Sequence, residues 1–349
     1  MSVSDATTSG VAMRTYELQG RFGAENLRIC ERPIPAPGPG QVLLRMRAMS
    51  LNYRDVMMID GAYNPRQPLP LVPLSDGVGE VVEVGAGVRW PKTGMRVCPI
   101  FAEGWLEGPP NRAKLATTLG GPLPGTLTEY RLAPAPAVVE APSHLTDAEA
   151  ATLPCAAVTA WHALISEGRL QPGEKVLVQG TGGVSIFALQ FAAMVGAEVV
   201  VTSSSSAKLE RARELGASHG IDYRAHPEWG KAARAWSGGE GVDLIVEVGG
   251  AGTMENSLRA IRPGGTIAVI GVLAGASQAL SVTPILMQQI RMQGIIVGSR
   301  AIFEAMNRAI HHARLRPVVD RVFDFEDARG ALDHLRSGRH FGKVVIAAR

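Results

Sequence analysis

The chain has 349 residues, 46% of them hydrophobic and 19% charged, which is typical of a globular protein long enough for two hydrophobic cores. Its net charge of +3 is too small to indicate nucleic-acid binding. No apolar run is long enough to span a bilayer, and the three widely spaced cysteines form no Cys-x-x-Cys pair. We therefore expect a cytoplasmic protein without nucleic-acid or membrane partners.

The N-terminal part is predicted to be a compact, mainly antiparallel β domain. Residues 1–12 are small and polar, lack the features of a signal peptide, and are expected to form a disordered leader. The clearest strand patterns alternate apolar and polar residues over 41–48 and 79–85. Segment 101–124 is rich in glycine and proline and is expected to form a surface lobe.

Strand and helix patterns alternate from residue 176 onward. Strands are predicted at 176–178, 198–202, 242–250, 266–271 and 294–299. Helices are predicted at 184–195 and 207–215, and residues 257–261 are expected to close a further helix. Continuous β-branched strands with helices between them form a parallel sheet buried on both faces, which predicts a doubly wound α/β fold. A final helix at 326–335 and a strand at 343–346 are expected to fold back onto the first domain.

The most informative motif is the glycine-rich turn that precedes the helix at 184–195. Gly180 and Gly182 match the first two glycines of G-x-G-x-x-G, and Ser185 stands in place of the third. Such a turn lets a pyrophosphate approach the backbone at a helix N-terminus, and serine is small enough for close helix–strand packing. The motif predicts a dinucleotide site; the alternative is a glycine-rich turn without a ligand.

The segment after the second strand indicates which dinucleotide is bound. NAD sites usually place an acidic residue about 20 residues beyond the glycines, where it bonds the ribose 2′-hydroxyl. Here no carboxylate stands between Glu198 and Glu210, and the segment contains a serine run at 203–206 followed by Lys208. Hydroxyls and a cation suit a 2′-phosphate, which predicts NADP(H). The alternative is a serine-rich turn that only caps the next helix.

Several motifs, taken together and in order, resemble the medium-chain dehydrogenase/reductase family. They are Gln41–Leu44, Leu51–Asp55, Gly79–Gly85, Gly94–Val97, Thr152–Cys155, Leu170–Val178 and His340–Val345. The resemblance extends over nearly the whole chain from Met13 onward. It implies a GroES-like catalytic domain formed by 13–155 and 300–349, a Rossmann domain at 156–299, and an active-site cleft between them.

The resembled family contains zinc alcohol dehydrogenases and zinc-free reductases. A catalytic zinc needs three protein ligands and one open position. The family's ligand positions hold Asn52, Ser75 and Cys155 in this sequence, and an amide and a hydroxyl are poor zinc ligands. The region of the family's structural zinc, 98–130, contains only Cys98. The resemblance therefore predicts no metal.

Without zinc, another group must polarise the substrate. In zinc-free quinone and enoyl reductases, this environment comes from the segment that corresponds to 52–63. The resemblance implies that the amide of Asn52 donates to a substrate oxygen and that Tyr63 is the proton donor. The alternative for Tyr63 is an aromatic side chain packed across the cleft. Asp55 is expected to bond the backbone, and Cys155 to be a buried, small hydrophobic residue.

The resemblance also assigns cofactor contacts by position. Thr159 is assigned to the nicotinamide amide. The pyrophosphate is assigned to Gly180, Thr181, Gly182, Gly183 and Val184. The 2′-phosphate is assigned to Ser203, Ser204, Lys208 and Tyr223. Strand-end segments beside the ribose and nicotinamide contribute Gly249, Gly271, Val272, Leu273, Val297, Gly298 and Ser299. Lys343 is a candidate pyrophosphate contact, with a surface lysine as the alternative.

These expectations together predict a zinc-independent, NADPH-dependent reductase of quinones or α,β-unsaturated carbonyls. The alternatives are an NADP-dependent alcohol dehydrogenase and a non-catalytic NADPH-binding protein. An apolar substrate pocket has Met57, Met58, Phe101 and Trp105 as candidate lining residues. The resemblance further implies a homodimer joined through the predicted edge strand at 294–299.

Overall fold

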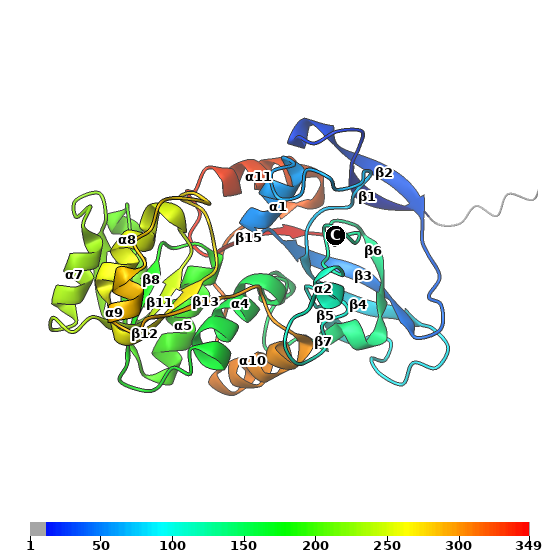
Figure 1. Cartoon of the computed structure of the whole chain (residues 1–349). Helices are drawn as coiled ribbons and strands as arrows, with labels where there is room; N and C mark the ends of the chain where they lie inside the picture. Colours follow the sequence, from blue (N-terminus) through cyan, green and yellow to red (C-terminus); the bar gives the residue numbers. More distant parts are fainter. Residues whose placement is uncertain (1–11, 349) are drawn as a thin grey trace, which may run out of the picture.

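The computed structural model describes residues 12–348 and contains two large β-sheets (Figure 1). The predicted leader, 1–12, lies outside the described residues except for Ala12, which begins strand β1 (Ala12–Leu18). Strand β1 pairs antiparallel with β2 (Leu27–Pro33) to form a separate hairpin. No helix within the described part of the chain is long and apolar enough to cross a membrane.

The first large sheet has six strands in the order β10-β9-β8-β11-β12-β13, all of them parallel. In chain order they are β8 (Lys175–Gln179), β9 (Glu198–Ser203), β10 (His219–Asp222), β11 (Val242–Glu247), β12 (Ile261–Val269) and β13 (Arg291–Gly294). The helices after these strands are α5 (Gly183–Val195), α6 (Ser206–Glu214), α7 (Trp229–Trp236), α8 (Ala251–Ala260) and α9 (Thr283–Met287). Alternate side chains of the central strands join separate apolar clusters on the two faces, which confirms the predicted doubly wound sheet.

The second large sheet has seven strands and is mainly antiparallel, as predicted. Its strands are β3 (Gln41–Ser50), β4 (Asp76–Val84), β5 (Arg96–Pro99), β6 (Tyr130–Pro134), β7 (Val138–Glu140), β14 (Val319–Asp324) and β15 (Lys343–Ala347). The C-terminal strand β15 pairs with β3, with Val345 opposite Ser50. The tail therefore folds back onto the N-terminal sheet, which confirms the expectation, while the domain boundaries at 155 and 300 stay predictions.

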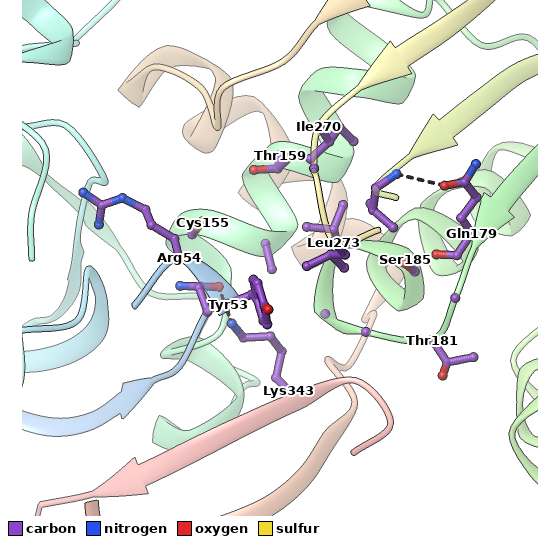
Figure 2. Close-up of a pocket in the computed structure, with 18 of the residues that line it drawn as sticks. Tyr53, Arg54, Cys155, Thr159, Gln179, Thr181, Ser185, Ile270, Leu273 and Lys343 are labelled. Carbon is purple, nitrogen blue, oxygen red and sulfur yellow. Dashed lines mark hydrogen bonds between the residues drawn. The ribbon is translucent and has the colours of Figure 1, made fainter. Parts of the chain in front are cut away.

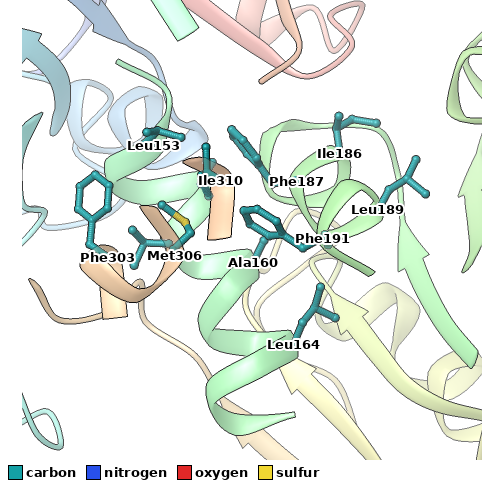
Figure 3. Packing of buried hydrophobic residues seen from close by; sticks show 14 of the residues in the cluster. Leu153, Ala160, Leu164, Ile186, Phe187, Leu189, Phe191, Phe303, Met306 and Ile310 are labelled. Carbon is teal, nitrogen blue, oxygen red and sulfur yellow. The ribbon is translucent and has the colours of Figure 1, made fainter. Parts of the chain in front are cut away.

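A buried apolar cluster joins the parallel sheet to the helices beside it (Figure 3). Helix α4 (Val158–Trp161) lies between π-helical turns and packs against α5, where the rings of Trp161 and Phe191 meet edge to face 5.4 Å apart. Helix α10 (Arg300–Ala313) adds Phe303 and Met306 to the same cluster. This packing fixes α4 beside the glycine-rich turn at the start of α5.

One predicted element is wrong in position. The edge strand is β13, which ends at Gly294, and no strand forms over 295–299. Val297 has a left-handed φ of 45°, and its carbonyl accepts a hydrogen bond from Nδ1 of His162 at 2.7 Å, so the chain turns inward instead of following the sheet. The helix expected to close at 257–261 is α8, which begins at Ala251 and ends at Ala260. The homodimer stays a prediction.

The segment 101–124 is not simply a surface lobe. Its apolar residues Phe101, Trp105 and Leu119 are almost completely buried, and Nε1 of Trp105 donates to the carbonyl of Gly108 at 2.8 Å. A short helix, α2 (Arg112–Leu115), covers the outer side of the segment. Glycine and proline shape turns here, but the aromatic residues between them anchor the segment to the core.

Candidate functional site

A cavity of about 480 Å³ is lined by residues from both large sheets and their flanking segments (Figure 2). One part follows the turn between β8 and α5 and the carboxyl ends of β9, β11 and β12. The other part is formed by helix α1 (Tyr53–Ile59), Phe101 and the start of β15. Ligands of open α/β sheets bind at the carboxyl ends of the strands, so the first part is the expected dinucleotide site.

The glycine-rich turn leaves the start of α5 open toward this cavity. Gly180 has a φ of +71°, a conformation that glycine adopts without strain. Gly182 precedes the helix and no side chain caps it, so backbone N–H groups of Gly183 and Val184 border the cavity without a capping partner. An uncapped helix N-terminus of this kind suits a pyrophosphate.

Ser185, at the position of the motif's third glycine, fits without disrupting the turn. Its side chain is buried, and its Oγ donates a hydrogen bond to the carbonyl oxygen of Gln179, 2.7 Å away. The serine therefore ties the first turn of α5 to the end of β8. Close helix–strand packing, which glycine provides in the motif, is kept here by a hydrogen bond.

A buried polar network supports the floor of the dinucleotide part. Nε2 of Gln179 donates to Glu247 at 2.6 Å, and Oε1 of Gln179 accepts from the backbone of Val248, drawn as a dashed line in Figure 2. Glu247 also accepts hydrogen bonds from Gly249 N and Thr253 Oγ1. These bonds hold the ends of β8 and β11 together.

At the far end of the dinucleotide part, the predicted 2′-phosphate residues lie together. Ser203, Ser204, Lys208 and Tyr223 all line the cavity. The ammonium of Lys208 donates to the carbonyls of Gly338 and His340 at 2.8 and 2.9 Å, and burial lowers its pKa. Among the described residues that line the cavity there is no Asp or Glu, whereas Arg54, Lys208 and Lys343 supply positive charge.

The opposite end of the cavity is aromatic and contains an arginine that was not predicted. The guanidinium of Arg54 lies 4.8 Å from the ring centroid of Tyr63 and 5.1 Å from that of Phe101. It also donates to the carbonyls of Leu119 and Gly121. This region is therefore an apolar, aromatic compartment with one cation held in its wall.

Asn52, one of the two predicted catalytic residues, directly precedes helix α1 as its N-cap. Asn52 and Asp55 form a capping box, in which the backbone N–H of Asn52 donates to Oδ2 of Asp55 at 2.7 Å. The predicted structural role of Asp55 is thus confirmed, and burial raises its pKa to about 7. The substrate contact of the Asn52 amide stays a prediction. In this structure Oδ1 of Asn52 accepts a hydrogen bond from Lys343.

The positions of the family's zinc ligands do not fit a zinc ion. Ser75 Oγ donates to Oδ1 of Asp76 at 2.8 Å, and burial next to Asp76 raises the pKa of the Cys155 thiol. The amide oxygen of Asn52 is taken by the ammonium of Lys343, 2.6 Å away. Over residues 12–348, no group of three or more His, Cys, Asp and Glu side chains is arranged to hold a metal. This arrangement lacks three free anionic or imidazole donors.

Most of the predicted site residues line the cavity. They are Asn52, Tyr63, Thr159, Gly180, Thr181, Gly182, Gly183, Val184, Ser203, Ser204, Lys208, Tyr223, Gly271, Val272, Leu273, Val297 and Lys343. Their individual roles stay predictions. Among the apolar candidates, Met57 and Phe101 also line the cavity.

Three predicted cofactor residues and two predicted substrate residues do not line it. Gly249 lies behind the wall against Thr253, Gly298 packs against Val158, and Ser299 caps α10 by accepting a hydrogen bond from Ile302 N. Met58 and Trp105 are buried in the core. Gly249, Gly298 and Met58 each directly follow a residue that lines the cavity, so position in the chain alone was insufficient to separate them.

The sequence prediction missed Tyr53, Arg54 and His340, all of which line the cavity. Tyr53 and Arg54 follow Asn52 directly, and an arginine next to a tyrosine was the available signal. Burial lowers the pKa of His340 to about 4, so its ring is neutral near pH 7. His340 is the first residue of the family motif His340–Val345, but no local sequence pattern predicts that it lies next to Gly182.

Comparison with known proteins agrees with this geometry. Residues 38–143 match the family described as alcohol dehydrogenase GroES-like domain, and residues 183–312 match zinc-binding dehydrogenase. A zinc-type alcohol dehydrogenase-like protein of Schizosaccharomyces pombe is 41% identical over 331 residues, which are 93% of this chain and 96% of that protein.

Two solved structures are similar over almost the whole chain. An NAD-dependent alcohol dehydrogenase has a TM-score of 0.88 and 33% identity, with 97% of this chain and 100% of that chain covered. A cobalt- and zinc-bound alcohol dehydrogenase from Pyrobaculum aerophilum has a TM-score of 0.83 and 31% identity, with the same coverage of 97% and 100%.

The fold and the cavity define an oxidoreductase that binds a nicotinamide cofactor. The chain belongs to the medium-chain dehydrogenase/reductase family, with alcohol dehydrogenase-like relatives.

Proposed function

We propose that the chain is a zinc-independent, NADPH-dependent reductase of quinones or α,β-unsaturated carbonyls. The observation that carries this proposal is the composition of one continuous cavity. Its dinucleotide part contains no described acidic lining residue, and its other part is aromatic and has no set of zinc ligands. Bound NADPH would supply the hydride.

The cofactor preference rests on the end of β9. A carboxylate there would repel a 2′-phosphate, whereas hydroxyls and an ammonium attract it. Ser203, Ser204 and Lys208 provide those groups, and the uncapped N-terminus of α5 would hold the pyrophosphate. Thr159 on α4 would contact the nicotinamide amide.

The substrate part would bind an apolar acceptor and hold its oxygen. Met57 and Phe101 exclude water, and Tyr63 lines the same space. A hydrogen bond from this phenol would stabilise negative charge on the acceptor oxygen and then deliver a proton. Arg54 beside the Tyr63 ring adds a fixed positive charge.

The decisive experiment is NADPH oxidation by EDTA-treated protein with a panel of quinones, enones and aldehydes. Turnover of a quinone or an enone without metal supports the proposed function. Activity that requires added zinc contradicts it. A matched assay with NADH measures the cofactor preference separately from the choice of acceptor.

The second candidate is an NADP-dependent alcohol dehydrogenase, which the names of the relatives favour. It predicts oxidation of alcohols with NADP⁺ and stimulation by zinc. The substitution of two zinc-ligand positions by Asn52 and Ser75 argues against it. Alcohol oxidation in the same EDTA-treated sample, with no enone or quinone reduction, would favour this second function.

A further inference from the structure

Lys343 lies at the inner end of the cavity and is not the surface lysine considered as an alternative. Only 3% of its side chain is exposed. Its aliphatic part crosses the glycine-rich turn so closely that a Cβ on Gly183 would lie 2.5 Å from Cδ of Lys343. Figure 2 shows the side chain extending from β15 toward the start of α1, beside Tyr53. Glycine at 183 is therefore needed for this route.

The ammonium at the end of this side chain is held by two close acceptors. Nζ donates to the carbonyl oxygen of Leu51 at 2.5 Å and to Oδ1 of Asn52 at 2.6 Å. Oδ2 of Asp76 lies 4.0 Å from Nζ, which makes an ion pair but not a hydrogen bond. An ammonium has three N–H donors, so one remains after these two bonds.

These neighbours are the residues at the family's zinc-ligand positions or directly beside them. Asn52 contacts Nζ itself. Asp76 follows Ser75 in the chain and accepts a hydrogen bond from its Oγ. The backbone N–H of Cys155 donates to the same Asp76 at 3.2 Å. A single buried cation thus lies among three chain segments that would otherwise surround a metal ion.

Charge compensation explains why an ammonium is tolerated there. A buried charge is costly unless it is paired and hydrogen-bonded. Asp76 is completely buried and supplies the opposite charge, while Ser75 and Cys155 satisfy its carboxylate oxygens. Arg54 adds a further positive charge near the site, and the neighbouring Asp55 is buried with its pKa raised to about 7.

We propose that the Lys343 ammonium takes the place of the catalytic metal: it holds Asn52 in position and donates its remaining N–H to the substrate oxygen. This inference rests on the proposed reductase function. When an enone accepts a hydride at its β-carbon, the C=C electrons move into the enolate and the negative charge develops on oxygen. Lys343 hydrogen-bonds that oxygen without losing its proton, and the proton added at the α-carbon comes from Tyr63 or water. Asp76 acts on Lys343 as a positioning residue.

The first test separates this role from a pyrophosphate contact. Lys343→Met is expected to lower kcat about 100-fold, the usual effect of losing one oxyanion donor, while the NADPH dissociation constant measured by fluorescence changes little. The matched comparison is Lys208→Met at the other end of the cavity, which is expected to weaken NADPH binding. If Lys343→Met instead weakens NADPH binding and keeps kcat, the proposal is wrong.

A neutral hydrogen-bonding variant guards against a folding defect. Lys343→Gln keeps an amide donor beside Leu51 but has no charge, and thermal unfolding shows whether either variant is folded. The proposal expects Lys343→Gln to bind NADPH normally and to lose most of its kcat. A folded Lys343→Gln protein with wild-type kcat would show that the charge is not used.

The second test needs no turnover, so it also separates this inference from the proposed function. Asn52→Cys with Ser75→His restores three metal ligands together with Cys155, and Co²⁺ binding is followed by its visible absorption. With Lys343 present we expect weak binding, and adding Lys343→Met is expected to tighten it at least about tenfold because the competing cation is gone. Equal Co²⁺ affinity with and without Lys343 would show that the ammonium does not occupy the metal position. If wild-type protein reduces no quinone or enone but the Co²⁺ difference holds, the proposed function fails while the placement of Lys343 stands.

Discussion

The guanidinium of Arg54 lies 4.8 Å from the ring of Tyr63, and the same guanidinium binds the carbonyl of Leu119. One side chain thus connects α1, the following loop and the segment that closes the aromatic end of the cavity. Tyr63 is 45% exposed, yet its ring has a fixed cationic neighbour. This relationship gives the exposed phenol a defined position in the proposed reaction.

Replacing Tyr63 by Phe is expected to lower kcat about 100-fold, because the hydroxyl that donates a proton is lost while the ring stays over Arg54. Steady-state kinetics with the best acceptor measures this. Tyr53→Phe is the matched control, since Tyr53 lines the same cavity and is 47% exposed. Equal losses in both variants would contradict a special role for Tyr63.

Ser204→Asp is expected to shift the cofactor preference from NADPH toward NADH. A carboxylate at the end of β9 repels a 2′-phosphate and accepts a hydrogen bond from a 2′-hydroxyl. The kcat/KM for NADPH divided by that for NADH should fall at least about tenfold, since even one charged contact is worth more than about 1.4 kcal/mol. Ser281→Asp, in an exposed loop away from the cavity, is the control and should leave the ratio unchanged.

Ser185→Ala is expected to destabilise the protein by about 1 kcal/mol, because the buried hydrogen bond to the carbonyl of Gln179 is lost. Ser185→Val should cost more, about 1–3 kcal/mol, since extra methyl groups do not fit between α5 and β8. Denaturant unfolding measures both values. A larger effect for Ala than for Val would mean that packing at this position is loose.

His340 predicts a specific pH dependence of stability. Burial, followed by the nearby charge of Lys208, lowers its pKa to about 4 from an ordinary value of 6.5. The folded state therefore binds fewer protons than the unfolded state between these values, so stability falls as the pH drops from about 6.5 to 4.

His340→Gln should remove this component, which is at most about 3 kcal/mol at pH 4. The measurement is the free energy of unfolding at several pH values for both proteins. His312→Gln is the control, because His312 is exposed on α10. The same pH slope in wild type and His340→Gln would contradict the assignment.

The dinucleotide half could be predicted because its signals are local. The β-branched runs and the glycine turn lie within single elements, and the resulting strands β8 and β9 begin and end close to the predicted residues. The prediction of a strand at 294–299 was wrong for a nonlocal reason. The apolar pattern is typical of a strand, but His162 hydrogen-bonds the carbonyl of Val297 and draws the chain inward. A residue far away in sequence decided the conformation.

The inner end of the cavity was hardest to predict for the same reason. Lys343 contacts Leu51 and Asn52, which lie almost 300 residues earlier in the chain. Family position suggested a phosphate contact, and no periodicity indicates the actual neighbours. Only the pairing of β15 with β3 brings the lysine to Asn52.

That pairing also sets the order in which the protein can mature during synthesis. Strand β3 is made early, but its neighbour β15 is translated after the whole parallel sheet. Until then one edge of β3 is open, and Asp76 has no Lys343 to balance its charge. A nascent chain can thus complete its parallel sheet before its mainly antiparallel sheet, because the pairing of β15 with β3 must wait until the whole parallel sheet has been made.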